Sequence, residues 1–260
     1  MNMPPGDDLT LIAVAALWGA VTGTLLPRAA YRFSVPWEEA EDGSAEDPGW
    51  RTTCPDGHPI RGWLGRARCG SCADTGTPCP YAPGALLLPT LTVLLCAALA
   101  VATGTRPELL VWLLLAPVGV LLAVVDLRVR RLPDPLTLPL AVAALALLAP
   151  AALLPEHAGH WTTALLGALA LGAGYLVLHL VNPGGMAFGD VKLALGTGAV
   201  LGWYGWATVM LGTFAAFLFG ALYGGALVVV GRAGRKTAIA FGPFMLAGTF
   251  TGLLIGAYAA

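Results

Sequence analysis

Apolar positions in this chain gather into long runs that are separated by short polar stretches. A run of roughly 20 apolar residues can cross about 30 Å of hydrocarbon as a helix. Such runs lie near 9–31, 85–104, 108–126, 135–154, 162–181, 206–230 and 238–259. A shorter, glycine-rich run near 190–204 is either an eighth span or a re-entrant piece shielded by its neighbours. The pattern predicts an all-α polytopic membrane protein with about eight transmembrane helices.

The composition supports the same class of protein. Apolar residues make up 57% of the 260 positions and charged residues only 11%. Soluble domains contain about 45–50% apolar and about 25% charged residues. The composition therefore excludes an ordinary soluble globular domain.

Basic residues predict the orientation in the membrane. With the N-terminus outside and eight helices following, thirteen of the fourteen lysines and arginines fall on the inner side, and only Arg106 falls outside. Basic residues near the ends of spans favour the cytoplasm. We therefore expect both termini outside, a first helix within 1–31, a small cytoplasmic loop domain at 32–84 and a transmembrane core at 85–260.

Five acidic residues occur between 85 and 260, and three of them have structural explanations. Asp134 lies between Pro133 and Pro135, a pattern that predicts a helix cap followed by proline at the first helical position. Glu108 favours the positive end of a helix on the outer side. Glu156 falls in an outer turn.

Asp126 and Asp190 remain as candidates for chemistry. Asp126 closes one apolar run and Asp190 opens another, so the predicted topology brings both to the cytoplasmic face. Ionisable groups at membrane depth are costly and usually mark a functional site. Two carboxyls at hydrogen-bonding distance share a proton, so one can activate water while the other donates to a scissile carbonyl. The pair predicts peptide hydrolysis without a covalent intermediate or a metal; the structural alternative is two helix ends paired with arginines.

Three segments carry a resemblance to a known family. GGMAFGDVK, with Asp190, and VVDLRVRRLPDPLTLP, with Asp126, resemble the two active-site segments of type IV prepilin peptidases, the first being their GxGD signature. IAFGPFMLAG at 239–248 is similar to the Phe-Gly-Pro-Phe element of the same family. Ala187 stands in place of the first glycine of the signature, and its small side chain still permits close packing.

The resemblance implies a GxGD-type intramembrane aspartyl peptidase of the bacterial inner membrane, which removes the leader of pilin-like precursors at the cytoplasmic face. It implies Asp126 and Asp190 as the catalytic pair. Residues expected to bind substrate or support the site are Gly189, Lys192, Phe241, Gly242, Pro243 and Phe244. By its spacing from Asp190, however, Lys192 is expected to point elsewhere on the helix and contact headgroups. The expected partners are the precursors and the lipid bilayer, with no nucleic acid.

A cluster of cysteines lies in the predicted loop. Thiols stay reduced in the cytoplasm, so a metal site is favoured over disulfides. The spacing predicts a structural zinc ion held by four sulfurs, or by three sulfurs and a histidine; free thiols are the alternative. The candidate ligands are Cys54, His58, Cys69, Cys72 and Cys79. In the longer members of the family that the chain resembles, this loop is associated with methylating the new N-terminus from S-adenosylmethionine, so that cofactor is expected only if the methyltransferase activity is retained.

Two functions from other classes remain open. Paired intramembrane carboxyls also relay protons in transporters. Transporters, however, commonly bind near the midplane between repeated halves, whereas Asp126 and Asp190 are expected at helix ends. A non-catalytic assembly component would leave the three motif segments unexplained.

Overall fold

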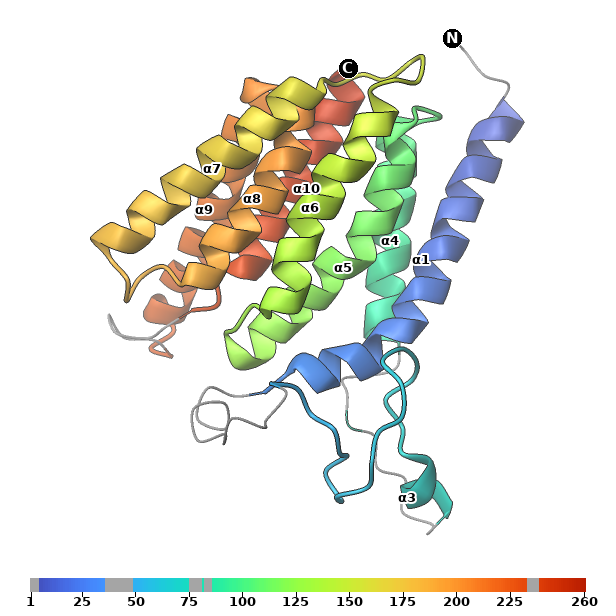
Figure 1. Cartoon of the computed structure of the whole chain (residues 1–260), viewed down its shortest axis with the longest axis vertical. Helices are drawn as coiled ribbons and strands as arrows, with labels where there is room; N and C mark the ends of the chain where they lie inside the picture. The colour runs from blue at the N-terminus through green and yellow to red at the C-terminus, as the bar shows by residue number, and fades with distance from the viewer. Residues whose placement is uncertain (1–4, 36–48, 75–80, 82–85, 233–238) are drawn as a thin grey trace.

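The computed structural model describes residues 5–35, 49–74, 81, 86–232 and 239–260. Long helices lie side by side in one bundle, and a short helix, α3 (Gly70–Asp74), lies in a loop segment beyond one end of it (Figure 1). The long helices are α1 (Pro5–Phe33), α4 (Leu87–Thr103), α5 (Glu108–Val129), α6 (Asp134–Ala151), α7 (Trp161–Val181), α8 (Phe188–Trp203), α9 (Trp206–Val229) and α10 (Gly242–Ala259). The prediction of an all-α polytopic membrane protein is confirmed.

Each predicted apolar run corresponds to one of these helices. Among the described residues, α1, α5, α6, α7, α9 and α10 are long and apolar enough to cross a membrane, and α4 is a shorter apolar helix. The weakest prediction, the run near 190–204, corresponds to one continuous helix, α8. Several boundaries differ from the prediction; for example, α5 continues past Asp126 to Val129, and α6 ends at Ala151 rather than at 154.

The short helix α8 is shielded from lipid by its neighbours. It contacts α6, α7, α9 and α10, and the side chains of Leu193, Ala194 and Ala199 are fully buried. Small residues allow the approach: a Cβ atom on Gly167 of α7 or on Gly198 of α8 would strike the carbonyl oxygen of the other glycine. Close backbone contact between small residues is a main source of helix association in membranes. A helix of 16 residues is therefore accommodated because protein, not lipid, surrounds it.

Helix α1 bends where it leaves the bundle, and the loop is attached at the bend (Figure 1). Pro27 lies inside the helix, where a proline removes a backbone hydrogen bond and kinks the chain. Gly65 of the loop binds both sides of the bend, donating its N–H to the carbonyl of Leu25 at 2.8 Å and accepting the N–H of Arg28 at 3.0 Å. Gly65 has a φ of 125°, which glycine adopts without strain.

Arginine side chains fasten the loop further. The guanidinium of Arg28 donates to the carbonyl of Arg61 at 2.8 Å, and that of Arg32 donates to the carbonyl of Gly62 at 2.8 Å. Arg32 also lies 4.0 Å above the ring of Trp63. The end of α1 and the loop therefore form one packed unit at the end of the bundle.

At the opposite end, Glu108 has a structural role, as predicted. It is the first residue of α5 and is fully buried. Its Oε1 atom accepts hydrogen bonds from the backbone N–H of Ala158 at 3.2 Å and the hydroxyl of Tyr204 at 3.3 Å. These bonds join the start of α5 to the α6–α7 connection and to the end of α8.

Candidate functional site

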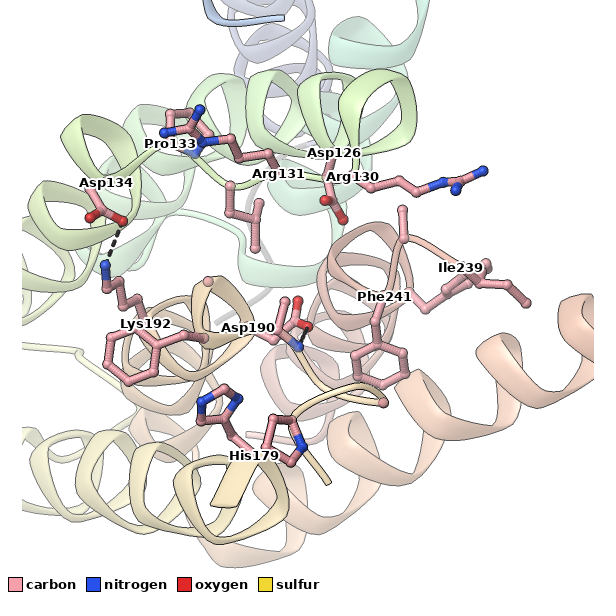
Figure 2. A pocket seen from close by; sticks show the side chains of 18 of the residues that line it. Asp126, Arg130, Arg131, Pro133, Asp134, His179, Asp190, Lys192, Ile239 and Phe241 are labelled. Atoms are coloured by element: carbon pink, nitrogen blue, oxygen red, sulfur yellow. Dashed lines mark hydrogen bonds and ion pairs between the residues drawn. The ribbon is translucent and has the colours of Figure 1, made fainter. Parts of the chain in front are cut away.

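Asp126 and Asp190 lie in the wall of one pocket of about 1150 Å³. Both side chains are only 4% exposed, and Figure 2 shows the two carboxyl groups turned toward the same space from different helices. The residues that line the pocket include the end of α1 and the starts of α6 and α8, which lie at the end of the bundle where the loop is attached (Figure 1). The structure thus brings together two acidic residues that are 64 positions apart in the sequence.

Asp126 is held by the segment that begins α10. It lies in the last turn of α5, and its Oδ2 atom accepts the backbone N–H of Gly242 at 3.0 Å. A Cβ atom at position 242 would lie 2.6 Å from that same oxygen. Only glycine leaves room for the carboxyl group to reach the backbone here.

Asp190 lies in the first turn of α8. Its Oδ2 atom accepts the backbone N–H of Ala187 at 3.2 Å. Ala187 has a φ of −73°, a value ordinary for alanine, so the departure from the GxGD signature introduces no backbone strain. Gly189 is packed closely: a Cβ atom there would lie 3.1 Å from the Cβ of Leu132.

The Phe-Gly-Pro-Phe segment is divided between two cavities. Phe241 and Phe244 line the pocket with the aspartates, and Gly242 contacts Asp126. Pro243 instead lines a separate, almost wholly apolar cavity of about 350 Å³ among α4, α5, α6, α8 and α10. Pro243 is therefore placed to shape the start of α10 and not to touch a substrate in the pocket.

Lys192 and Asp134 differ from their predictions. Asp134 makes no capping hydrogen bond; the N-cap of α6 is Pro133, and Asp134 is the first helical residue. Its Oδ1 atom instead lies 2.6 Å from Nζ of Lys192 (Figure 2). Lys192 is therefore paired with Asp134 in the wall of the pocket, a partner that its sequence prediction did not include. Spacing along one helix could not show this partner, because it comes from another helix.

Several pocket residues were not predicted from the sequence. Phe33 at the end of α1 and Trp50 of the loop line it, and both rings pack against Trp63, with centroids 5.1 Å and 5.2 Å away. His179 also lines the pocket, and its Nδ1 atom is hydrogen-bonded to the carbonyl of Met186 at 2.8 Å. No motif marks Phe33 or Trp50, because they come from segments far from Asp126 and Asp190.

Four of the five candidate metal ligands meet in the loop. The ligand atoms of Cys54, His58, Cys69 and Cys72 all lie within 4.8 Å of one another. Sγ of Cys54 is 3.8 Å from Sγ of Cys72 and 3.7 Å from Nδ1 of His58. Tetrahedral zinc with bonds of about 2.3 Å to sulfur separates two sulfurs by about 3.8 Å. The four residues fit a zinc ion; Cys79 lies outside the described residues.

The thiols of this cluster differ in their surroundings. Hydrogen bonding from the backbone of Cys72 lowers the pKa of the Cys69 thiol, whereas burial raises the pKa of the Cys72 thiol. Cys72 Sγ also donates to a carboxyl oxygen of Asp56 at 3.2 Å. A bound zinc ion would take all three sulfurs as thiolates.

Comparison with known proteins places the chain in a family. Residues 109–225 match the type IV leader peptidase family. The chain is 32% identical over 208 residues to a prepilin leader peptidase/N-methyltransferase of Aeromonas salmonicida, covering 76% of this chain and 66% of the relative. It is 33% identical over 228 residues to the enzyme of that name from Aeromonas hydrophila, covering 79% and 72%.

A third relative comes from another bacterial genus. A prepilin leader peptidase/N-methyltransferase of Bacillus subtilis is 31% identical over 166 residues, covering 64% of each chain. No solved structure matches the chain. The chain spans 66%, just under two thirds, of the length of the Aeromonas salmonicida relative. With the family match and these relatives together, the chain belongs to the type IV leader peptidase family.

Proposed function

We propose that this protein is a membrane-embedded aspartyl endopeptidase that removes the leader from pilin-like precursors at the cytoplasmic face. The observation that carries the proposal is the placement of Asp126 and Asp190, two buried carboxyls from different helices, in one pocket. Membership of the family and the names of the relatives support the same reaction.

The arrangement suits hydrolysis by a carboxyl pair. Each aspartate accepts one backbone N–H, from Gly242 or from Ala187, through its Oδ2 atom. These bonds fix the two carboxyl groups while leaving the other oxygen of each for water or substrate. One carboxylate would take a proton from the attacking water, and the other carboxyl would donate to the carbonyl oxygen of the scissile peptide. A gem-diol intermediate then collapses with proton transfer to the leaving amine.

The position of the pocket supports action at the membrane surface. Asp126 is in the last turn of α5 and Asp190 in the first turn of α8, so both lie near helix ends and not in the middle of a span. The same end of the bundle carries the arginine-fastened loop, which by the positive-inside rule favours the cytoplasm. This position supports a peptidase more than a midplane transporter.

Precursor cleavage tests the proposal directly. Purified protein in liposomes is incubated with a panel of pilin-like precursors, and the cut is located by mass spectrometry. Asp126→Asn and Asp190→Asn should each abolish cleavage, because an amide cannot exchange the proton that water activation requires. The variant Glu156→Gln, in an exposed turn on the predicted outer side, should cleave normally. Wild-type turnover by either aspartate variant would contradict the assignment.

The cysteine cluster supports a structural zinc site in the loop. Zinc held by Cys54, His58, Cys69 and Cys72 would cross-link the loop next to the end of α1. The relatives are named as N-methyltransferases as well as peptidases. Transfer of a labelled methyl group from S-adenosylmethionine to a cleaved precursor would show whether this chain retains that second activity.

A further inference from the structure

The turn that follows Asp126 contacts the helix that carries Asp190 at two points. Leu132, which is 7% exposed, lies over Gly189, immediately before Asp190. Asp134 forms its ion pair with Lys192, two positions after Asp190. The start of α8 is therefore held on both sides of Asp190: before it by the packing of Leu132 on Gly189, and after it by the ion pair of Lys192 with Asp134.

The turn itself is firmly connected to Asp126. Arg130 takes the left-handed conformation, with a φ of 52°, and donates its N–H to the carbonyl of Asp126 at 2.8 Å. Pro133 precedes Asp134, and Pro135 follows it at the start of α6, and each proline fixes its own φ. A displacement of Asp134 is therefore transmitted to Asp126 through a short, stiff segment.

Two contacts hold the ammonium group of Lys192 in one position. Its side chain is 19% exposed, and its ammonium lies 4.9 Å from the ring centroid of Phe188 as well as 2.6 Å from Asp134. Both members of the pair line the pocket of the aspartates. The ammonium is thus engaged by a carboxylate and an aromatic face, and Figure 2 shows it directed toward Asp134 and not toward either catalytic candidate.

We propose that the Lys192–Asp134 ion pair is a positioning clamp that sets the spacing of the two catalytic carboxyls. The inference rests on the proposed function. The pair joins the segment after Asp126 to the segment after Asp190, and neither member reaches the reacting atoms. Misplacement of catalytic groups by about 1 Å can cost roughly a hundredfold in rate, so a modest ion pair can have a large effect on turnover.

A charge exchange tests the clamp. Lys192→Met and Asp134→Asn should each lower kcat for a cleaved precursor by about tenfold or more with little change in KM, because positioning acts on the chemical step. The conservative variant Lys192→Arg and the double variant Asp134→Lys/Lys192→Asp should recover most of kcat. Glu156→Gln, far from the pair, serves as the matched control of an acidic residue. Folding of each variant is checked by its thermal unfolding transition.

A chemical cross-link reports on the contact without any cleavage assay. A water-soluble carbodiimide condenses a carboxylate with a touching amine into an amide, taking up the water that is released. In wild-type protein it should join the peptides that contain Asp134 and Lys192, and mass spectrometry should find no such product in Lys192→Arg.

The outcomes separate the clamp from the proposed function. A double variant that is no more active than the single variants overturns the clamp. A rise in KM at constant kcat in the Lys192 variant also overturns it and assigns Lys192 to substrate binding. A missing cross-link in wild-type protein also overturns it. Wild-type protein that cuts no precursor counts against the peptidase proposal, while the cross-link still decides whether the pair holds the two segments together.

Discussion

The position of Gly242 shows how one residue shapes the site. Its backbone N–H reaches Asp126, and its lack of a side chain is what allows the carboxyl oxygen to approach. The Phe-Gly-Pro-Phe segment is similar to a family element, but the sequence did not show which of its four residues meets an aspartate. That contact depends on the packing of α10 against α5, which local sequence does not encode.

We predict that Gly242→Ala impairs catalysis more than folding. The added Cβ would lie 2.6 Å from Oδ2 of Asp126, so the carboxyl must move, and cleavage should fall by about tenfold to a hundredfold. Gly225→Ala in α9 is the matched control, since its Cβ meets nothing within 4 Å. Single-turnover cleavage rates of the two variants, compared with wild type, give the test. Equal rates for all three would show that Asp126 does not need this backbone contact.

At the scale of elements, the apolar runs predicted every long helix, because the hydrocarbon thickness sets their length. The ends of these helices were less predictable. The prolines on either side of Asp134 predicted a helix cap, yet its carboxylate pairs with Lys192 of α8. The bend of α1 at Pro27 was also not predicted, nor was its bonding to Gly65. Contacts between distant segments decided each of these cases.

We predict that the loop binds about one zinc ion per chain, which elemental analysis of purified protein measures. Cys72→Ser should remove the metal, because Cys72 is the most buried of the clustered ligands, at 1% exposed. Cys96→Ser should retain it, since Cys96 is buried in α4 away from the loop. Cleavage should fall only partly when zinc is lost. Metal-free wild-type protein with full activity would leave the cysteines as free thiols.

For the whole molecule, the sequence predicted the class of fold, the helix order and the meeting of Asp126 with Asp190 near one end of the bundle. The predicted topology was sufficient for this, since it requires only which helix ends share a membrane face. It could not predict that the pocket wall includes Phe33 and Trp50, because these residues arrive through the bend of α1 and the packing of the loop.

We predict that labelling of single cysteines in intact cells will show the orientation of the bundle. Glu156→Cys, in an exposed turn on the predicted outer side, should react with a membrane-impermeant maleimide. Arg232→Cys, at the exposed end that follows α9, should react only after the membrane is permeabilised. Peptide mass spectrometry distinguishes these sites from the native cysteines. The reverse labelling pattern would invert the assignment of both termini to the outside.

The hydrogen bond from Gly242 to Asp126 has a consequence for synthesis. Helix α10 follows the other helices along the chain, and helices are made in order at the ribosome. The α7–α8 hairpin can close before α10 is made, through the contact of Gly167 with Gly198. Asp126 acquires its backbone partner only when α10 has inserted. On the proposed function, a nascent chain that lacks α10 would therefore be unable to cleave a precursor, because the backbone contact that holds Asp126 forms only after α10 has inserted.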